Sequence, residues 1–481
     1  MKRMMFILPM LLATMVSAQD LQTIAQRDLV GTARYVGMAG AMTAVGGDPS
    51  AVVDNPAGIG VFRRLDVSLS LDMNFDRVRW LESKQKAGEY NAFTASQASF
   101  IFALPSPSGR WHYNNVMFSY HRLASFNRRY TAFQTAEWSL ADLMCLNTDG
   151  LPKSAVSSEG RWDNVNVGWL SCQAYDTYLI SPTKEDSLIW ENPLDDGQTV
   201  NNHFTITETG YVNQYSLGWG GNFDDRLFLG VTLNMLSLYH NQTVQYYEEF
   251  GEGCGLDNNT YFSQSALGFN AAVGVIYHPI KWVRLGASFT TPSALTLTTT
   301  SYGNLSSTLW IPNAETGVKE LSTHASATPQ NRYTDRSLTM PLRVSVGAAF
   351  QCLNYGLLSV QYDYAHNKYI NDIHTLRVGV EGVIVNHFFI NAGYAFEGTF
   401  KKSSPIILDP TTVRTDAYTQ TINNSQYITA GFGWRAHHVT VHAAYRLRMQ
   451  QLDTYAHQLA EPYKLKALTH GLVVTIGFHT R

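Results

Sequence analysis

The stretch LDVSLSLDMNFD, from Leu65 to Asp76, decides the fold. Apolar and polar residues alternate through it in six consecutive pairs. A period of two is the pattern of a β-strand with one apolar and one polar face. The run is longer than the usual strand of about five or six residues. It fits the roughly 9–11 residues that a tilted strand needs to cross a bilayer, so the stretch predicts a membrane-spanning strand.

The same alternation recurs along the rest of the chain and predicts fourteen strands, an even number. Bacterial outer-membrane barrels of a single chain have even numbers of antiparallel strands. The expected strands are 65–76, 92–104, 114–127, 211–221, 227–239, 264–278, 282–297, 337–351, 356–365, 374–385, 388–398, 426–435, 438–449 and 466–478.

The connections between these strands alternate between short and long. Outer-membrane barrels combine short periplasmic turns with longer extracellular loops, and an even strand number then places both termini in the periplasm. Phe478, close to the C-terminus, fits the aromatic residue that commonly ends such barrels. The sequence therefore predicts an all-β fold, a transmembrane antiparallel β-barrel of about 14 strands, in the outer membrane of a Gram-negative bacterium. The long connections are 77–91, 128–210, 240–263, 298–336, 366–373, 399–425 and 450–465.

The composition agrees with this fold class. The mean hydropathy is only −0.15, as expected when half of the strand residues face a polar lumen. Aromatic residues make up 12% of the chain, which suits the girdles at the two membrane interfaces. The net charge of −3 gives no sign of a nucleic-acid partner.

The N-terminus predicts a secretory signal peptide over residues 1–18. Lys2 and Arg3 precede an apolar run from Met4 to Val16, and cleavage is expected after Ala18. The apolar run is too short to be a membrane anchor, which needs about 20 residues.

Residues 19–62 lie between this leader and the first strand, and residues 63–481 form the barrel. A fourteen-stranded lumen is too wide for its own side chains to fill, since barrels of about 16–18 strands enclose an aqueous channel. We expect residues 19–62 to fold into the lumen as a hatch, with a disordered tail as the alternative. Asp48-Pro49 predicts a helix start, Asn55-Pro56 predicts its end, and Gly46-Gly47 would join two short helices.

The run GTARYVGMAGAMTAVGGDPSAVVDNPAGIGVF (31–62) resembles the N-terminal hatch of the FadL/TodX family of outer-membrane transporters for long-chain fatty acids and hydrophobic compounds. Asn55, Pro56 and Ala57 lie in its most specific part. Looser similarity in 283–297, 338–350 and 376–396 extends the resemblance over nearly the whole chain. The resemblance implies a fourteen-stranded barrel plugged by the hatch, which agrees with the strand count.

The resemblance also implies a function: uptake of lipophilic molecules, either long-chain fatty acids or aromatic hydrocarbons. Outer loops would capture the substrate and pass it to a pocket against the hatch, whose gating residues would be Asp48, Asn55, Pro56 and Ala57 with Gly46 and Gly47. The exit would be sideways into the bilayer through a kink in the third strand. For an apolar molecule, leaving directly into hydrocarbon is more favourable than crossing water.

The third strand holds a residue that fits such a kink. Val116, Phe118 and Tyr120 set an outward phase that also turns Arg122 outward. An arginine facing lipid costs roughly 2–4 kcal/mol at the bilayer midplane. Either a bulge re-aims Arg122 and kinks the strand, or Arg122 lies near the outer headgroups and snorkels.

The long connection 128–210 is rich in aromatic residues. It is either a lipid-catching surface or a loop folded on itself over the barrel mouth. The candidate capture residues are Trp138, Trp162, Trp169 and Trp190.

The cysteines and acidic residues of the outer loops give weaker signals. Cys145 and Cys172 are the preferred disulfide pair, with free thiols as the alternative. Glu248, Glu249 and Glu252 form either a solvated acidic loop or a cation site.

No motif for an enzyme, a cofactor or a metal is present. The sequence contains no GxSxG motif, and none of its fifteen histidines lies in an HExxH motif. A passive general porin or a surface adhesin remains the alternative to a transporter. The expected partners are lipophilic small molecules, outer-membrane lipid and the outer-membrane insertion machinery, and no catalytic residue is assigned.

Overall fold

The computed structural model describes residues 24–480 except 82–83, 108, 165, 314–315, 353–355, 369–370, 386, 400–414 and 416. The predicted signal peptide, residues 1–18, and the first residues of the predicted hatch lie outside this range. Among the described residues, no helix is long and apolar enough to cross a membrane.

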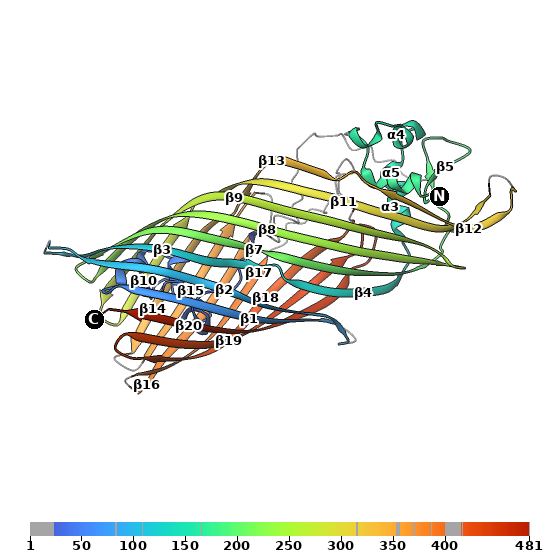
Figure 1. Ribbon diagram of the computed structural model, residues 1–481. Helices are drawn as coiled ribbons and strands as arrows, with labels where there is room; N and C mark the ends of the chain where they lie inside the picture. Colours follow the sequence, from blue (N-terminus) through green and yellow to red (C-terminus); the bar gives the residue numbers. More distant parts are fainter. Residues whose placement is uncertain are drawn as a thin grey trace.

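The chain forms a closed antiparallel β-barrel of fourteen spans, which confirms the predicted fold class (Figure 1). Each span pairs with its neighbours in the chain, and the first pairs with the last from Asp66↔His479 to Trp80↔Leu465. In chain order the spans are β1 (Asp66–Trp80), β2 (Lys86–Pro105), β3 (Trp111–Ser125) with β4 (Arg128–Ala136), β7 (Val200–Phe223), β8 (Leu227–Gly251), β9 (Cys254–Ile280), β10 (Val283–Thr290) with β11 (Ser293–Pro312), β13 (Asn331–Met340) with β14 (Leu342–Cys352), β15 (Gly356–His366), β16 (Ile373–Val385), β17 (Phe388–Thr399), β18 (Thr419–Arg435), β19 (Val439–Tyr455) and β20 (Tyr463–His479).

Two of these spans are interrupted by proline. Pro292 separates β10 from β11, and Pro341 separates β13 from β14. Proline has no N–H to give to the strand ladder, so a span that contains it breaks there. The predicted strands 282–297 and 337–351 are therefore each two segments of one span.

The long connections contain more strand than the sequence predicted. β7, β8 and β9 have 24, 25 and 27 residues, whereas a tilted span needs only about 9–11. β12 (Lys319–Ala327) pairs with the end of β11 in a projecting hairpin. The predicted loops 240–263 and 298–336 are thus largely paired strand, because their backbone groups continue the ladders of the spans below.

The two faces of the barrel are inverted relative to a soluble protein. On β1, Leu69, Leu71, Met73 and Phe75 are exposed on the outer face, while the polar residues between them face the lumen and are buried or half-buried. An apolar outer band around a polar interior is the arrangement of membrane barrels.

The connection between β4 and β7 folds into a small domain over one end of the barrel (Figure 1). Its apolar core continues into the upper lumen through Tyr130, Phe204 and Tyr463. Its elements are α3 (Leu140–Thr148), α4 (Lys153–Ser157), η3 (Arg161–Asp163), α5 (Trp169–Asp176), β5 (Ser181–Pro182) and β6 (Trp190–Glu191).

Candidate functional site

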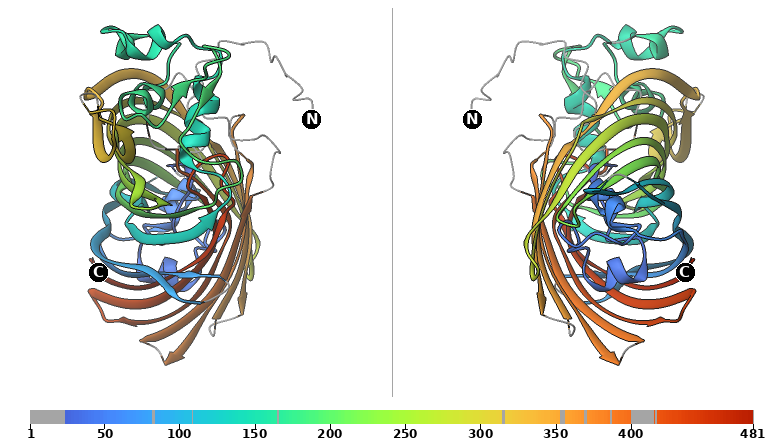
Figure 2. Two further views of the ribbon diagram at one scale, coloured as in Figure 1. Left: turned by 90° about the vertical axis from the view of Figure 1, so that its right-hand side faces the viewer. Right: turned by 90° about the vertical axis from the view of Figure 1, so that its left-hand side faces the viewer.

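The N-terminal segment, residues 24–62, lies inside the barrel (Figure 2). It includes the short helices α2 (Ala33–Gly37), η1 (Ala51–Val53) and η2 (Pro56–Val61). α2 contacts β18, β19 and β20, and η2 contacts β7, β8 and β9 on the other side of the lumen. The segment therefore reaches across the lumen from wall to wall.

Glycines on the inner wall let this segment approach closely. A Cβ added at Gly274 would lie 1.9 Å from Asn55 Oδ1, and one added at Gly230 would lie 2.2 Å from the backbone of Pro56. Gly286 faces Thr43 in the same way. A glycine inside a strand often marks such close backbone approach, so the strand glycines are the signal in the sequence that could have located these contacts.

Asn55, Pro56 and Ala57 lie together at the start of η2. Asn55 Oδ1 accepts a hydrogen bond from Ala57 N at 3.0 Å, and its Nδ2 donates to Thr43 O at 2.8 Å and to Val275 O of β9 at 3.1 Å. A helix ends before Asn55-Pro56, as predicted, because η1 stops at Val53 and Asn55 is extended. The same pair also begins the next helix, η2. Asparagine is a good N-cap, and proline suits the first helical position.

Asp48 is not the N-cap of a helix, so the prediction of a helix start at Asp48-Pro49 was wrong. Its carboxylate accepts hydrogen bonds from Thr32 Oγ1 at 2.8 Å and from Ser50 N at 2.9 Å, and η1 begins only at Ala51. These bonds close a loop between α2 and η1. Gly46 and Gly47 lie within that loop with φ of +63° and +66°, a conformation that favours glycine.

Buried ion pairs tie the N-terminal segment to the wall. Arg34 binds Glu381 of β16 through two bonds of 2.7 and 2.8 Å. Arg377, also on β16, lies 3.2 Å from Asp54. These residues could not be found from the sequence, because paired charges far apart in the chain leave no local pattern.

The first described residues of the segment fill an apolar part of the lumen. Ile24 and Ala25 are fully buried there, and Ala25 O accepts a hydrogen bond from Arg343 of β14 at 2.7 Å. We call this the lumen pocket. Its wall residues are Leu123, Ala124, Phe126, Val212, Leu236, Leu238, Ala266, Leu295, Leu297 and Met340.

Beside the lumen pocket the barrel wall has a gap. β2 and β3 pair only from Pro105↔Tyr113 to Gln97↔His121. Beyond that point β2 pairs with β1 alone, and β3 pairs with β7 alone. The two sides come back together where Gly88 of β2 meets the backbone of Arg129 on β4. The unpaired stretch between these contacts is the wall gap.

A bulge in β3 lies at the edge of the wall gap. The β3–β7 register shifts between Arg122 and Ala124. Arg122 keeps the outward phase, and its Nε donates to Asn213 Oδ1 at 3.2 Å, with the guanidinium 5.0 Å from the ring centre of Tyr211. The shift falls after Arg122 and changes which residues of β3 face inward; it does not turn Arg122 into the lumen.

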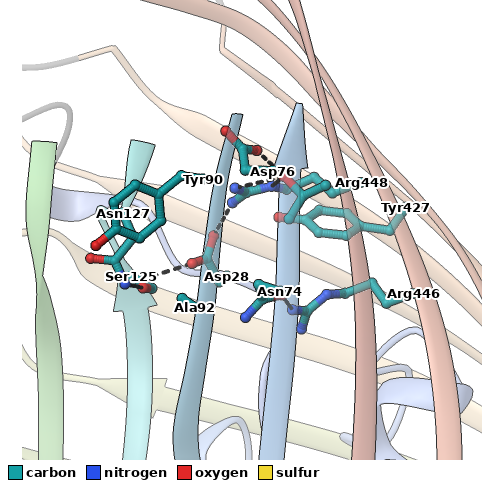
Figure 3. Close-up of a pocket in the computed structure, with 11 residues that line it drawn as sticks. Asp28, Asn74, Asp76, Tyr90, Ala92, Ser125, Asn127, Tyr427, Arg446 and Arg448 are labelled. Carbon is teal, nitrogen blue, oxygen red and sulfur yellow. Dashed lines mark hydrogen bonds and ion pairs between the residues drawn. The ribbon is translucent and has the colours of Figure 1, made fainter. Parts of the chain in front are cut away.

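Asp28 fills the wall gap from inside (Figure 3). Its N–H donates to Leu123 O at 2.8 Å, and its Oδ2 accepts from Ser125 N at 2.9 Å. Its other carboxylate oxygen is paired with Arg448 of β19. Asp28 therefore satisfies backbone groups of β3 that would pair with β2 in a complete wall, and buried backbone groups need such partners.

The space left around Asp28 is small. The cavity between Tyr90 and Ala92 of β2 and Ser125 of β3 measures about 20 Å³, enough for one water molecule. The wall gap is closed in this structure, with the side chain of Asp28 as the closing group.

Most of the candidate capture residues are not on the surface. Trp169 and Trp190 are buried in the core of the small domain between β4 and β7, which we call the end domain. Trp162 packs edge-on against Trp169, with the ring centroids 5.5 Å apart. Trp138 alone of the four is highly exposed, at 52%. This packing matches the interpretation of a loop folded on itself.

Glu248 and the cysteines also differ from expectation. Glu248 is fully buried and accepts hydrogen bonds from Tyr246, from Ser139 and, at 2.8 Å, from Leu140 N at the start of α3. It anchors the end domain and belongs neither to a solvated acidic loop nor to a cation site. Cys145, Cys172 and Cys254 are free thiols, so the predicted Cys145–Cys172 disulfide was wrong.

Comparison with solved structures gives the same architecture. The toluene transporter TodX of Pseudomonas putida matches with a TM-score of 0.52 and 11% identity, covering 94% of this chain and 99% of that one. A FadL homologue of Pseudomonas aeruginosa matches at 0.54 and 11%, covering 95% and 99%. The toluene transporter TbuX of Ralstonia pickettii matches at 0.52 and 12%, covering 96% and 100%.

The likeness to these proteins is one of fold over the full length of the chain. No family model matches the sequence, and no curated protein matches it. The chain thus has the barrel fold of the FadL-type hydrophobic-compound channels.

Proposed function

We propose that this protein is an outer-membrane channel for the uptake of lipophilic molecules, with residues 19–62 acting as a hatch. The observation that carries the proposal is the wall gap closed by Asp28 directly beside the lumen pocket. A general porin needs neither an apolar pocket in its lumen nor an interruption in its wall. The solved structures of the same fold that are described as toluene transporters support the same class of cargo.

The proposed path has three stages. A lipophile enters at the end of the barrel that carries the end domain, where Trp138 is exposed. It displaces Ile24 and Ala25 from the lumen pocket and takes their apolar contacts. Because Asp28 follows three residues after Ala25, this movement pulls its carboxylate away from Ser125, and the substrate leaves through the wall gap into hydrocarbon.

The orientation follows from the loops. We propose that the end domain faces the outside and that both termini are periplasmic, as in barrels with short periplasmic turns. Asp48, Asn55, Pro56 and Ala57, together with the Gly46-Gly47 bend, would then hold the hatch in its closed position. Insertion by the outer-membrane assembly machinery and contact with outer-membrane lipid belong to the same proposal.

Arg343 supports a fatty acid over a hydrocarbon as the cargo. Its guanidinium donates to Ala25 O in the closed state and loses this partner when Ala25 moves. A carboxylate headgroup would replace the carbonyl with a stronger, charge-assisted bond. An aromatic hydrocarbon offers no such group and remains the alternative.

Uptake into liposomes tests the proposal. The purified protein is compared with a variant lacking residues 19–60, using a fluorescent long-chain fatty acid and parallel planar-bilayer conductance. We expect the intact protein to take up the lipid without ionic conductance, and the deletion to open a conducting pore. Free ion conduction by the intact protein without lipid uptake would favour a general porin, and absence of both activities would favour an adhesin.

The wall gap is tested by cross-linking. Cysteines at positions 28 and 125, in a background without the native cysteines, are joined with a short bis-maleimide. The cross-linked protein should lose uptake, while the same protein before cross-linking should take up at least as much as the wild type, because it lacks the Asp28 carboxylate. Uptake that survives cross-linking would rule out lateral exit at this gap.

A further inference from the structure

A row of positive charges crosses three strands on the outer face of the barrel. Arg79 of β1 lies directly opposite Lys466 of β20 on one side and Lys86 of β2 on the other. Directly opposite residues of an antiparallel pair point to the same face, and Val78 beside Arg79 is fully buried toward the interior. The three cations therefore lie side by side on the outside of the wall.

Further cations surround this row. Arg77 is the next outward residue of β1 on the side of Arg79 away from the end domain, and Lys464 is the next outward residue of β20 from Lys466 toward the end domain. Lys84 lies in the turn that joins β1 to β2. Together these six residues are called the basic patch: Arg77, Arg79, Lys84, Lys86, Lys464 and Lys466.

The basic patch is only partly neutralised by the protein. Glu89, opposite Arg77, binds Lys86 at 2.8 Å, and Asp453 lies opposite Lys464. Among the described residues, Arg77, Arg79 and Lys466 form no ion pair. Like charges directly opposite each other destabilise a sheet, so an anion from outside the chain would stabilise this row. The chain as a whole carries a net charge of −3, which makes such a cluster a local feature.

The height of the basic patch on the wall identifies the anion. Directly below it on β1 the outward residues are Phe75, Met73, Leu71 and Leu69, each exposed by 37–49%. From Val67 to Phe75 this apolar band is as long as a tilted strand needs to cross the hydrocarbon, about 9–11 residues. Arg77 and Arg79 are thus the first outward residues above the hydrocarbon, at the level of the lipid headgroups.

We propose that the basic patch binds the phosphate groups of a phosphorylated lipid in the leaflet that surrounds the end-domain side of the barrel. Arginine offers a planar fork that fits phosphate, and the neighbouring lysines add point charges. The apolar band below receives the acyl chains of the same lipid. In the orientation proposed above this is the outer leaflet, where the phosphorylated lipid is a glycolipid of the lipid A type. The inference rests on the proposed outer-membrane location.

Native mass spectrometry of the detergent-purified, full-length protein with added lipid A tests this inference. The double variant Arg79→Gln/Lys466→Gln removes two charges of the row. The control Arg110→Gln/Lys281→Gln removes two exposed charges near the short-turn end of the barrel. Each cation near an anionic lipid surface contributes about a fivefold change in affinity, so the double variant should bind roughly 25-fold more weakly, while the control should bind like the wild type.

Two further measurements define the ligand. Lipid A without its phosphates should bind the wild type no better than phosphorylated lipid A binds the double variant, and inorganic phosphate alone should not compete at millimolar concentration. Equal binding of the double variant and the wild type, or of the two lipids, would overturn the inference. Both variants should still take up fatty acid in phosphatidylcholine liposomes, so a failure here is distinct from a failure of the proposed transport function.

Discussion

Asp28 accepts a hydrogen bond from the backbone of Ser125 at 2.9 Å, across the place where β2 no longer pairs with β3. A side chain of the N-terminal segment thereby completes a strand ladder of the wall. In a membrane, unpaired backbone groups cost several kcal/mol each. In the proposed function, movement of the N-terminal segment and opening of the wall would therefore be one event.

Replacing Asp28 should make the wall gap open more often. Asp28→Ala removes the hydrogen-bond acceptor of Ser125 N and the ion-pair partner of Arg448, which costs the closed state about 1–3 kcal/mol. We expect fatty-acid uptake into liposomes to rise several-fold. Asp225→Ala, which breaks an exposed ion pair with Arg63, is the matched control. Uptake that is the same in both variants would show that Asp28 does not hold the gap closed.

Adding a side chain on the inner wall should push the N-terminal segment out of place. Gly274→Ala places a Cβ within 1.9 Å of Asn55, and overpacking of this kind costs about 1–3 kcal/mol. The expected result is a lower unfolding temperature together with new ionic conductance in planar bilayers. Gly109→Ala is the control, because nothing lies within 4 Å of its added Cβ. If Gly274→Ala changed neither the unfolding temperature nor the conductance, the segment would not be packed against β9.

Glu248 should hold the end domain to the barrel. Its carboxylate faces three hydrogen-bond donors, whereas the amide of Glu248→Gln offers one acceptor oxygen and adds donors of its own. We expect faster cleavage within residues 137–199 during limited proteolysis. Glu249→Gln changes the exposed neighbour and should leave the cleavage rate unchanged. If the two variants are cleaved alike, Glu248 does not anchor the domain.

The thiols of the end domain should react slowly with alkylating reagents. Burial raises the pKa of Cys145 and of Cys172 to about 12, and only the thiolate is an effective nucleophile. At pH 8, iodoacetamide should therefore label Cys254, which is partly exposed, well before these two. Mass spectrometry of the labelled peptides checks this, and a Cys145–Cys172 disulfide peptide in the unreduced sample would contradict the structure.

The barrel itself could be predicted from the sequence because successive residues of a strand face opposite sides of the sheet, so that apolar and polar residues alternate. Leu65 to Asp76 shows this most clearly, and its alternation is the burial pattern of β1. The upper parts of β8 and β9 were expected to be loops. Polar residues such as Gln245 and Asn259 occupy strand positions there, since beyond the membrane the outer face no longer has to be apolar.

The candidate site could be predicted only in part. The sequence pointed to a hatch and to an irregularity near Arg122, where the β3–β7 register does shift. It gave no sign of Asp28, which lies in a segment without periodicity and acts through residues about a hundred positions away. The helix start predicted at Asp48 was wrong, because the carboxylate of Asp48 is bonded to Thr32 in a loop. The helix end predicted at Asn55-Pro56 was confirmed.

The length of β7, β8 and β9 has a consequence for where the protein meets its cargo. These strands exceed a membrane span by about 14 residues. At roughly 3.3 Å per residue, they extend the barrel wall well beyond the bilayer even when tilted. In the proposed orientation the entrance of the barrel lies at the far end of this extension, away from the lipid headgroups. A lipophilic molecule would therefore enter the barrel at a distance from the membrane surface and descend to it inside a channel lined by protein.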